Sequence, residues 1–204
     1  MTLYDLKPRF QAMLRPMVAR MAAAGVRANH VTVAAAVLSV LLGVWLAVLG
    51  QPHPLFILLP VWLFLRMAMN AIDGMLAREF DQATPLGVYL NEIGDIVSDA
   101  ALLLPFAVLH VFGAFWVGLV IVMTLVAEYA GVLGWAVGAG RRYDGPFGKS
   151  DRALVLGLLG LWIGVGGALP VWLWWIMPAM AVLLLMTTIN RVRAVTAGAS
   201  GNEQ

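Results

Sequence analysis

The stretch "NAIDGMLAREF", residues 70–80, ends a long apolar segment and leads into "DQATPLGVYLNEIGDIVSDA", residues 81–100. Both stretches lie in or beside segments that otherwise resemble membrane spans, yet they carry amide, carboxylate and guanidinium groups. Such groups are costly inside a bilayer, so they indicate a functional site by default. The polar residues in question are Asn70, Asp73, Arg78, Asn91, Asp95 and Asp99.

The spacing of these residues predicts two polar stripes on neighbouring helices. Positions 70, 73, 74 and 77 recur at intervals of three and four, which places them on one helical face. Positions 87, 91, 95 and 99 repeat every four residues on the next helix. Because Thr84 and Pro85 suit a helix start after a short turn, the two helices are expected to be antiparallel with their stripes facing.

Carboxylate and amide oxygens converging from two helices suit Mg²⁺ or Mn²⁺, and the chain contains no Cys. Gly74 and Ala77 would let a ligand approach the backbone, while Arg78 is placed to clamp a phosphate. Small residues taken singly are more readily explained as helix-packing positions. Two aspartates embedded in membrane helices are not readily explained as packing positions. Arg66, however, could form a structural ion pair with Asp99 or Glu128.

The composition predicts an all-α integral membrane protein with a single domain, residues 1–204. Of its 204 residues, 62% are hydrophobic and 12% charged. The pattern predicts an interfacial amphipathic helix over 3–24, a six-helix transmembrane bundle over 31–192 and a flexible tail over 194–204. The six spans are expected at about 31–49, 54–79, 84–110, 113–139, 151–168 and 170–192.

The distribution of Lys and Arg predicts the orientation in the membrane. Basic residues gather in the amino terminus, the 79–83 turn, the 140–152 loop and the carboxyl tail, and the alternate connections have none. Both termini and the polar stripes are therefore expected on the cytoplasmic side. The basic residues form no patch with interleaved aromatics, so nucleic acid is not an expected partner.

The residues from Asn70 to Asp95 resemble the signature of the CDP-alcohol phosphotransferases, D-x2-D-G-x2-A-R-x8-G-x3-D-x3-D. The spacing agrees at every step, and the six-span plan with an amino-terminal interfacial helix is similar to that family over nearly the whole chain. The chain looks most like a bacterial inner-membrane branch. The resemblance implies a transferase that uses a CDP-linked lipid such as CDP-diacylglycerol, and relatives tend to be dimers, so a homodimer is considered.

The resemblance also implies roles for individual residues. The acidic positions of the family bind two divalent metals, which makes Asp73 a metal ligand and Asp95 both a ligand and the candidate general base. The CDP moiety would be received by Gly74, Ala77 and Arg78, with Asn29 and Thr32 approaching the nucleotide or capping a helix. In the region of Lys149 and Arg152, basic residues of the family help to bind a phosphorylated acceptor.

The chain departs from the signature at the first and third acidic positions, which are Asn70 and Asn91. Both keep an oxygen donor but lose a negative charge. Three outcomes stay open: one metal or two weakly held metals, compensation by Glu92 or Asp99 as a further ligand, or an inactive relative. Asp99 is the better substitute because it continues the stripe.

The expected function is transfer of a phosphatidyl or other substituted phosphate group from a CDP-linked lipid to an alcohol, with release of CMP, in phospholipid biosynthesis. Mg²⁺ or Mn²⁺ would assist this step. The alternatives are an inactive relative that binds CDP-lipid or a partner protein, and a transporter that uses buried carboxylates. The acceptor alcohol, the metal number and the oligomeric state are not legible in the sequence.

Overall fold

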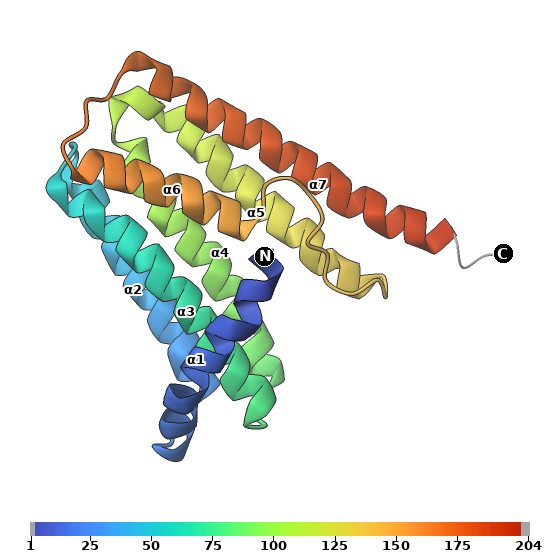
Figure 1. Cartoon of the computed structure of the whole chain (residues 1–204). Coiled ribbons are helices and arrows are strands. Elements are labelled where there is room, and N and C mark those ends of the chain that lie inside the picture. The colour runs from blue at the N-terminus through green and yellow to red at the C-terminus, as the bar shows by residue number, and fades with distance from the viewer. Residues whose placement is uncertain (1–2, 201–204) are drawn as a thin grey trace. The chain divides into compact units, whose positions relative to one another are not determined.

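The computed structural model of the chain describes residues 3–200, with side chains for residues 10–197 (Figure 1). This part of the chain is entirely helical, with seven α-helices and three short 3-10 helices (η), which confirms the all-α prediction. In chain order these are α1 (Leu3–Ala23), α2 (Ala28–Leu49), η1 (Pro54–Ile57), α3 (Leu58–Glu79), α4 (Pro85–Ala107), η2 (His110–Phe112), α5 (Ala114–Ala136), α6 (Lys149–Gly164), η3 (Val171–Trp175) and α7 (Ile176–Ser200).

Four of the helical segments are long and apolar enough to cross a membrane: 28–49, 54–79, 114–136 and 171–197. The predicted spans at 84–110 and 151–168 coincide with α4 and α6 but are not among the four. Helix α6 has only 16 residues, and α4 carries Glu92, Asp95 and Asp99. The count of six spans therefore stays a prediction.

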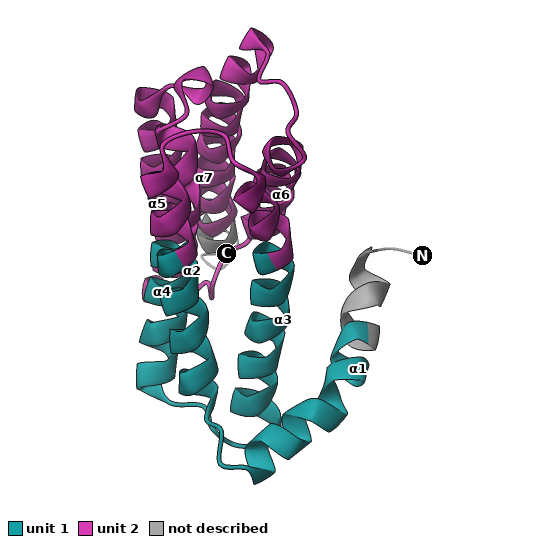
Figure 2. Ribbon diagram, turned by 90° about the vertical axis from the view of Figure 1, so that its left-hand side faces the viewer, with its two compact units in different colours: residues 1–41, 62–98 teal, residues 42–61, 99–204 magenta. Residues whose placement is uncertain are grey.

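The carboxyl end differs from the flexible tail expected over 194–204. Helix α7 continues to Ser200, and residues 201–204 lie outside the described part of the chain. Contacts divide the chain into two compact units, unit 1 (1–41 and 62–98) and unit 2 (42–61 and 99–204) (Figure 2). Because α2, α3 and α4 each contribute residues to both units, the single-domain expectation stays a prediction.

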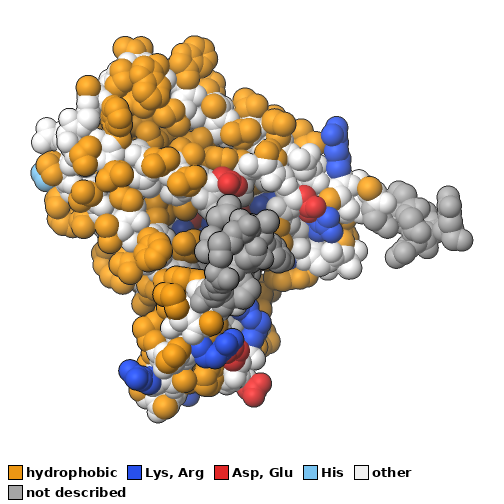
Figure 3. All heavy atoms as spheres, viewed as in Figure 1, with side chains coloured by type: hydrophobic (Ala, Val, Ile, Leu, Met, Phe, Trp, Pro, Cys, Tyr) orange, Lys and Arg blue, Asp and Glu red, His pale blue; other side chains and the backbone are white. Residues whose placement is uncertain are grey.

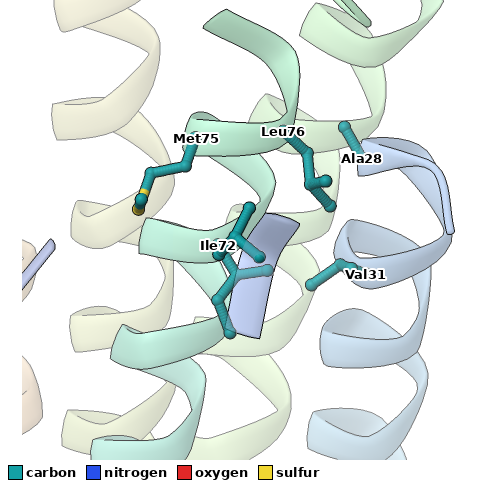
Figure 4. Packing of buried hydrophobic residues seen from close by; sticks show 6 residues of the cluster. Ala28, Val31, Ile72, Met75 and Leu76 are labelled. Atoms are coloured by element: carbon teal, nitrogen blue, oxygen red, sulfur yellow. The ribbon is translucent and has the colours of Figure 1, made fainter. Parts of the chain in front are cut away.

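The core of unit 1 forms where α1 and α2 pack against the carboxyl half of α3. Buried Val18 of α1 joins Ile72, Met75 and Leu76 of α3, and the start of α2 completes the cluster with Ala28 and Val31 (Figure 4). Leu14 and Met21 pack against this cluster, whereas Met13 is 75% exposed. The apolar stripe predicted for residues 3–24 is thus used partly for packing, and its interfacial role stays a prediction.

One side chain links two helix junctions of unit 1. Gln82, in the turn between α3 and α4, accepts a hydrogen bond from the backbone N–H of Ala28 at 2.7 Å. Its amide nitrogen also donates to the carbonyl of Val26 at 3.4 Å. The turn before α4 is thereby tied to the start of α2, which fixes the ends of the helices that carry the polar stripes.

Unit 2 is built around helices that approach closely at glycines. Helix α5 packs along α7, and α6 packs against η1. A Cβ atom at Gly43 of α2 would overlap the carbonyl oxygen of Ala101 in α4, and one at Gly160 of α6 would lie 2.7 Å from Leu59 Cβ. Small residues at such crossings let backbones pack without an apolar driving force, as in membrane helices.

Large apolar side chains cover much of the molecular face shown in Figure 3. Leu41 is 60% exposed, Phe64 58% and Leu154 63%. Exposure of this kind on long apolar helices is expected when lipid, and not water, surrounds the helices.

Replacing Gly43 by alanine tests the close approach of α2 to α4. The added methyl group meets backbone, which cannot move aside as a flexible side chain would, so we expect a loss of about 1–3 kcal/mol in unfolding free energy. Thermal or denaturant unfolding in detergent measures this loss. Gly118→Ala is the matched control, because nothing lies within 4 Å of a Cβ at this helical glycine of α5. Equal stability of the two variants would contradict the described packing.

Candidate functional site

Asp73 of α3 is held in unit 1 by a hydroxyl from α2. The carboxylate residue is only 5% exposed, and Thr32 donates a hydrogen bond to its Oδ2 at 2.8 Å. Thr32 is itself buried, and its hydroxyl lies 3.2 Å from the carbonyl of Ala28. The sequence suggested that Thr32 caps a helix or approaches a nucleotide. Neither suggestion included a hydrogen bond that orients a carboxylate.

Asp95 of α4 receives two nitrogen donors from α3. Arg66 Nη2 lies 3.1 Å from Asp95 Oδ1 and 3.1 Å from the Asp95 carbonyl. Asn70 Nδ2 lies 3.5 Å from the same Oδ1, a weaker contact. The structure therefore brings Asn70 and Asp95 together across the two helices, with Asp73 three residues further along the Asn70 face.

Glycines of the signature make room for specific polar groups. A Cβ at Gly74 would lie 2.7 Å from Arg78 Nη2, so the Arg78 guanidinium folds back over Gly74. A Cβ at Gly87 of α4 would lie 2.8 Å from Asn29 Oδ1 of α2. Asn29 is the second residue of α2 and lies inside the helix, whereas the sequence suggested the cap position before it. Close approach to ligand or side chain is the reason that glycine suits both positions.

The other predicted site residues of unit 1 have different surroundings. Ala77 packs against the apolar cluster of α1, α2 and α3. Asn91 is partly buried one turn before Asp95 on α4. The ligand roles given to Ala77 and Asn91 stay predictions.

Unit 2 contains a buried cluster of charges centred on Glu128 of α5. Arg152 of α6, 2% exposed, bonds Glu128 Oε1 at 2.9 Å and Asp99 Oδ2 at 2.7 Å. Glu128 Oε2 is 3.2 Å from Arg141 Nη2 and 3.5 Å from Arg191 Nη1 of α7. The cluster holds three guanidinium and two carboxylate groups.

Several nitrogens of this cluster have no hydrogen-bond partner within the described residues, namely Nε and Nη1 of Arg152 and Nε of Arg191. Buried donors of this kind favour an additional acceptor. Asp99, predicted as a metal ligand, is thus a partner of Arg152, and Arg152, predicted to bind the acceptor, is engaged with two carboxylates. Lys149 begins α6 and is partly buried.

The loop between α5 and α6 has its own ion pair. Arg142 Nε donates to Asp144 Oδ2 at 2.8 Å. The hydrogen bonds from this guanidinium hold the pKa of Asp144 below its usual range. Asp144 thereby stays ionised, and the loop keeps its bridge, at any pH near neutrality.

A divalent cation in unit 1 would need oxygen donors from α3 and α4. Within residues 10–197, no three His, Cys, Asp or Glu side chains are grouped to hold a metal ion. A cation at Asp73 and Asp95 would therefore be completed by amide, phosphate or water oxygens, which Mg²⁺ accepts readily. Thr32 engages one oxygen of Asp73 and Arg66 one of Asp95, as outer-shell partners orient ligating carboxylates. The donor types present, carboxylate and amide oxygens, are those that one such ion takes.

Two of the interactions at the site were not expected from the sequence. Arg66 pairs with Asp95, a partner that the sequence did not suggest, and the suggested pairing with Asp99 or Glu128 stays a prediction. The signal was present, because positions 66, 70, 73 and 74 share the spacing of one helical face. The Thr32 bond to Asp73 had no such signal, since it joins residues 41 positions apart.

Replacing Thr32 by valine tests the support of Asp73. The variant keeps the shape but removes the hydroxyl, so the buried carboxylate loses a donor and unfolding free energy should fall by about 1–3 kcal/mol. Chemical unfolding in detergent measures it. Thr188→Val is the control, because Thr188 bonds the carbonyl of Leu184 in its own helix. An unchanged stability of Thr32→Val beside an unchanged control would contradict this bond.

Comparisons with known proteins show the family of the chain. The model of the family described as CDP-alcohol phosphatidyltransferase matches residues 26–186. The chain is 48% identical over 198 residues to the inner membrane protein YnbA of Escherichia coli K12, covering 96% of each chain. Its fold is similar to the crystal structure of Mycobacterium tuberculosis phosphatidylinositol phosphate synthase (PgsA1) with CDP-DAG bound, with a TM-score of 0.69, 20% identity, and coverage of 88% of this chain and 92% of that one. The chain belongs to the CDP-alcohol phosphatidyltransferase family.

Proposed function

We propose that this protein transfers a phosphatidyl or other substituted phosphate group from a CDP-linked lipid such as CDP-diacylglycerol to an alcohol, releasing CMP. The observation that carries the proposal is the meeting of signature residues from α3 and α4, with Asn70 Nδ2 3.5 Å from Asp95 Oδ1 and Asp73 on the same helix face as Asn70. The family match over residues 26–186 supports it.

In the proposed reaction the acceptor oxygen attacks the phosphorus that bears the lipid. A new oxygen–phosphorus bond forms, the bond from that phosphorus to the oxygen of CMP breaks, and CMP leaves with the bonding electrons. The carboxylate of Asp95 takes the proton of the alcohol and later releases it to water. Arg66 orients Asp95 at 3.1 Å, and Thr32 orients Asp73 at 2.8 Å.

A divalent cation, Mg²⁺ or Mn²⁺, would be held by Asp73 and Asp95 with Asn70 or Asn91 as a neutral donor. When bound, such an ion neutralises charge on the phosphate oxygens. The Arg78 guanidinium, which lies over Gly74, would bind the diphosphate of the donor. Gly74, Ala77, Asn29 and Thr32 would then lie near the CDP group.

We assign the acceptor to basic residues of unit 2, Lys149 and Arg152. The charge cluster around Glu128 has three guanidinium and two carboxylate groups, and buried donors of Arg152 and Arg191 have no partner within the described residues. A net positive cluster of this kind favours a phosphorylated alcohol. The protein would lie in a bacterial inner membrane with six spans, and with both termini and the site on the cytoplasmic side.

A non-catalytic CDP-lipid binding protein is the second candidate. It is favoured by Asn70 and Asn91, because two carboxylates of the family signature are absent. Both candidates would bind the nucleotide, but only the enzyme would release CMP. A measurement of turnover therefore distinguishes them.

The central experiment incubates purified protein, CDP-diacylglycerol and Mn²⁺ with a panel of phosphorylated and unphosphorylated alcohols, and measures CMP and new lipid by mass spectrometry. We expect metal-dependent release of CMP, lowered roughly 10²- to 10⁴-fold by Asp95→Asn through loss of the base. Asp81→Asn is the control, because Asp81 is exposed and its φ of 53° suits Asn. If no alcohol supports turnover, and Asp at positions 70 and 91 switches it on, the native chain is a binding protein.

A second measurement tests the acceptor assignment. Lys149→Gln removes one charge-assisted contact, worth about 1.5–3 kcal/mol, so kcat/KM for a phosphorylated acceptor should fall roughly ten- to hundredfold. The KM for CDP-diacylglycerol should stay unchanged. Arg193→Gln, an exposed position on α7, should leave both values unchanged. A selective loss for the donor would place Lys149 elsewhere in the reaction.

A further inference from the structure

Arg66 is a buried, charged residue of unit 1 that lies beside the candidate site. The residue is only 4% exposed, and its Nη2 lies 3.1 Å from Asp95 Oδ1. The guanidinium is therefore a buried, permanently positive group placed directly against one of the two carboxylates of the candidate site.

The same oxygen of Asp95 faces a second N–H donor. Asn70 Nδ2 is 3.5 Å from Oδ1, so both nearest side chains of α3 present hydrogens to it. A cation binds the lone pairs of a carboxylate oxygen, and Oδ1 of Asp95 already accepts from N–H groups, so the cation that Asp73 and Asp95 would share is expected nearer to Asp73. The positive charge of the Arg66 guanidinium therefore already lies beside Asp95.

The charges of this group within unit 1 lead to the same conclusion. Two carboxylates, Asp73 and Asp95, and two guanidinium groups, Arg66 and Arg78, give −2 + 2 = 0. Asn70 and Asn91 are neutral. One dication brings the total to +2, which a diphosphate offsets. A second dication would lie roughly 3.5–4 Å from the first and close to the guanidinium, and like charges in a buried site repel strongly.

We propose that this site binds a single divalent cation, on the Asp73 side, and that the Arg66 guanidinium supplies the positive charge on the Asp95 side. The inference rests on the proposed function in so far as the cation and the diphosphate of the donor share the site. It concerns the stoichiometry of binding, which is measured without turnover.

The first test titrates Mn²⁺ into purified protein saturated with CDP-diacylglycerol and follows free Mn²⁺ by electron paramagnetic resonance. One Mn²⁺ bound per chain is the expected result. Two per chain, or none, would overturn the proposal. Arg15→Met serves as a control for loss of an arginine, because Arg15 pairs with Glu79 at an exposed position, and it should also bind one.

Two variants then identify the role of Arg66. Restoring both carboxylates in Asn70→Asp/Asn91→Asp, with Arg66 kept, should leave one Mn²⁺ per chain. Adding Arg66→Met to that pair should raise the count to two. A count of two in the double variant would show that Arg66 does not take the place of a cation. If the triple variant does not fold, as judged by size exclusion, the wild type and the double variant still decide.

The outcome is separable from that of the proposed function. A wild-type chain that binds one Mn²⁺ but releases no CMP with any acceptor would refute the enzymatic proposal and support this inference. A chain that turns over with two Mn²⁺ bound would refute this inference alone.

Discussion

Compensation of buried charge is the constraint on which this structure depends. In a chain that is 62% hydrophobic, each carboxylate placed among apolar helices needs a donor or an opposite charge, because desolvation costs several kcal/mol per ion. Asp73 meets Thr32, Asp95 meets Arg66, and Glu128 meets Arg152. In each case the partner comes from another segment, so the same bonds that neutralise the charge also fix the packing of helices.

The two units use this constraint differently. In unit 1 the signature residues form a small group around two aspartates, with Gly74 leaving room for Arg78. In unit 2 three guanidinium groups gather around Glu128 and Asp99, and buried nitrogens of Arg152 and Arg191 have no hydrogen-bond partner within the described residues. The first arrangement presents carboxylate and amide oxygens, whereas the second has more guanidinium groups than carboxylates.

Much of the fold could be predicted because the chain is strongly patterned. Apolar runs of about 20 residues and the Pro85 start of α4 located most of the helices to within a few residues, although α7 ends eight residues beyond the predicted span. The helical spacing also predicted that Asn70 of α3 and Asp95 of α4 would meet. These features depend on helical periodicity alone.

The rest depends on contacts that periodicity does not encode. The partners of Glu128 come from a loop and two helices, up to 63 residues away in the case of Arg191. The guanidinium of Arg191 also bonds the Ala127 carbonyl. An arginine side chain is long enough to contact any of several carboxylates that lie one turn apart. Helical spacing therefore does not predict that Arg66 contacts Asp95. Helix α4 carries three acidic residues and is not among the four segments that are long and apolar enough to cross a membrane, so the span predicted at 84–110 stays a prediction.

The two hydrogen bonds of the Gln82 side chain affect how this part of unit 1 can move. Its amide holds the N–H of Ala28 and the carbonyl of Val26, so the start of α2 is not able to fray without releasing the turn between α3 and α4. The two junctions therefore open as one cooperative event, and hydrogen exchange at Ala28 reports on the freedom of residues 80–84 as well.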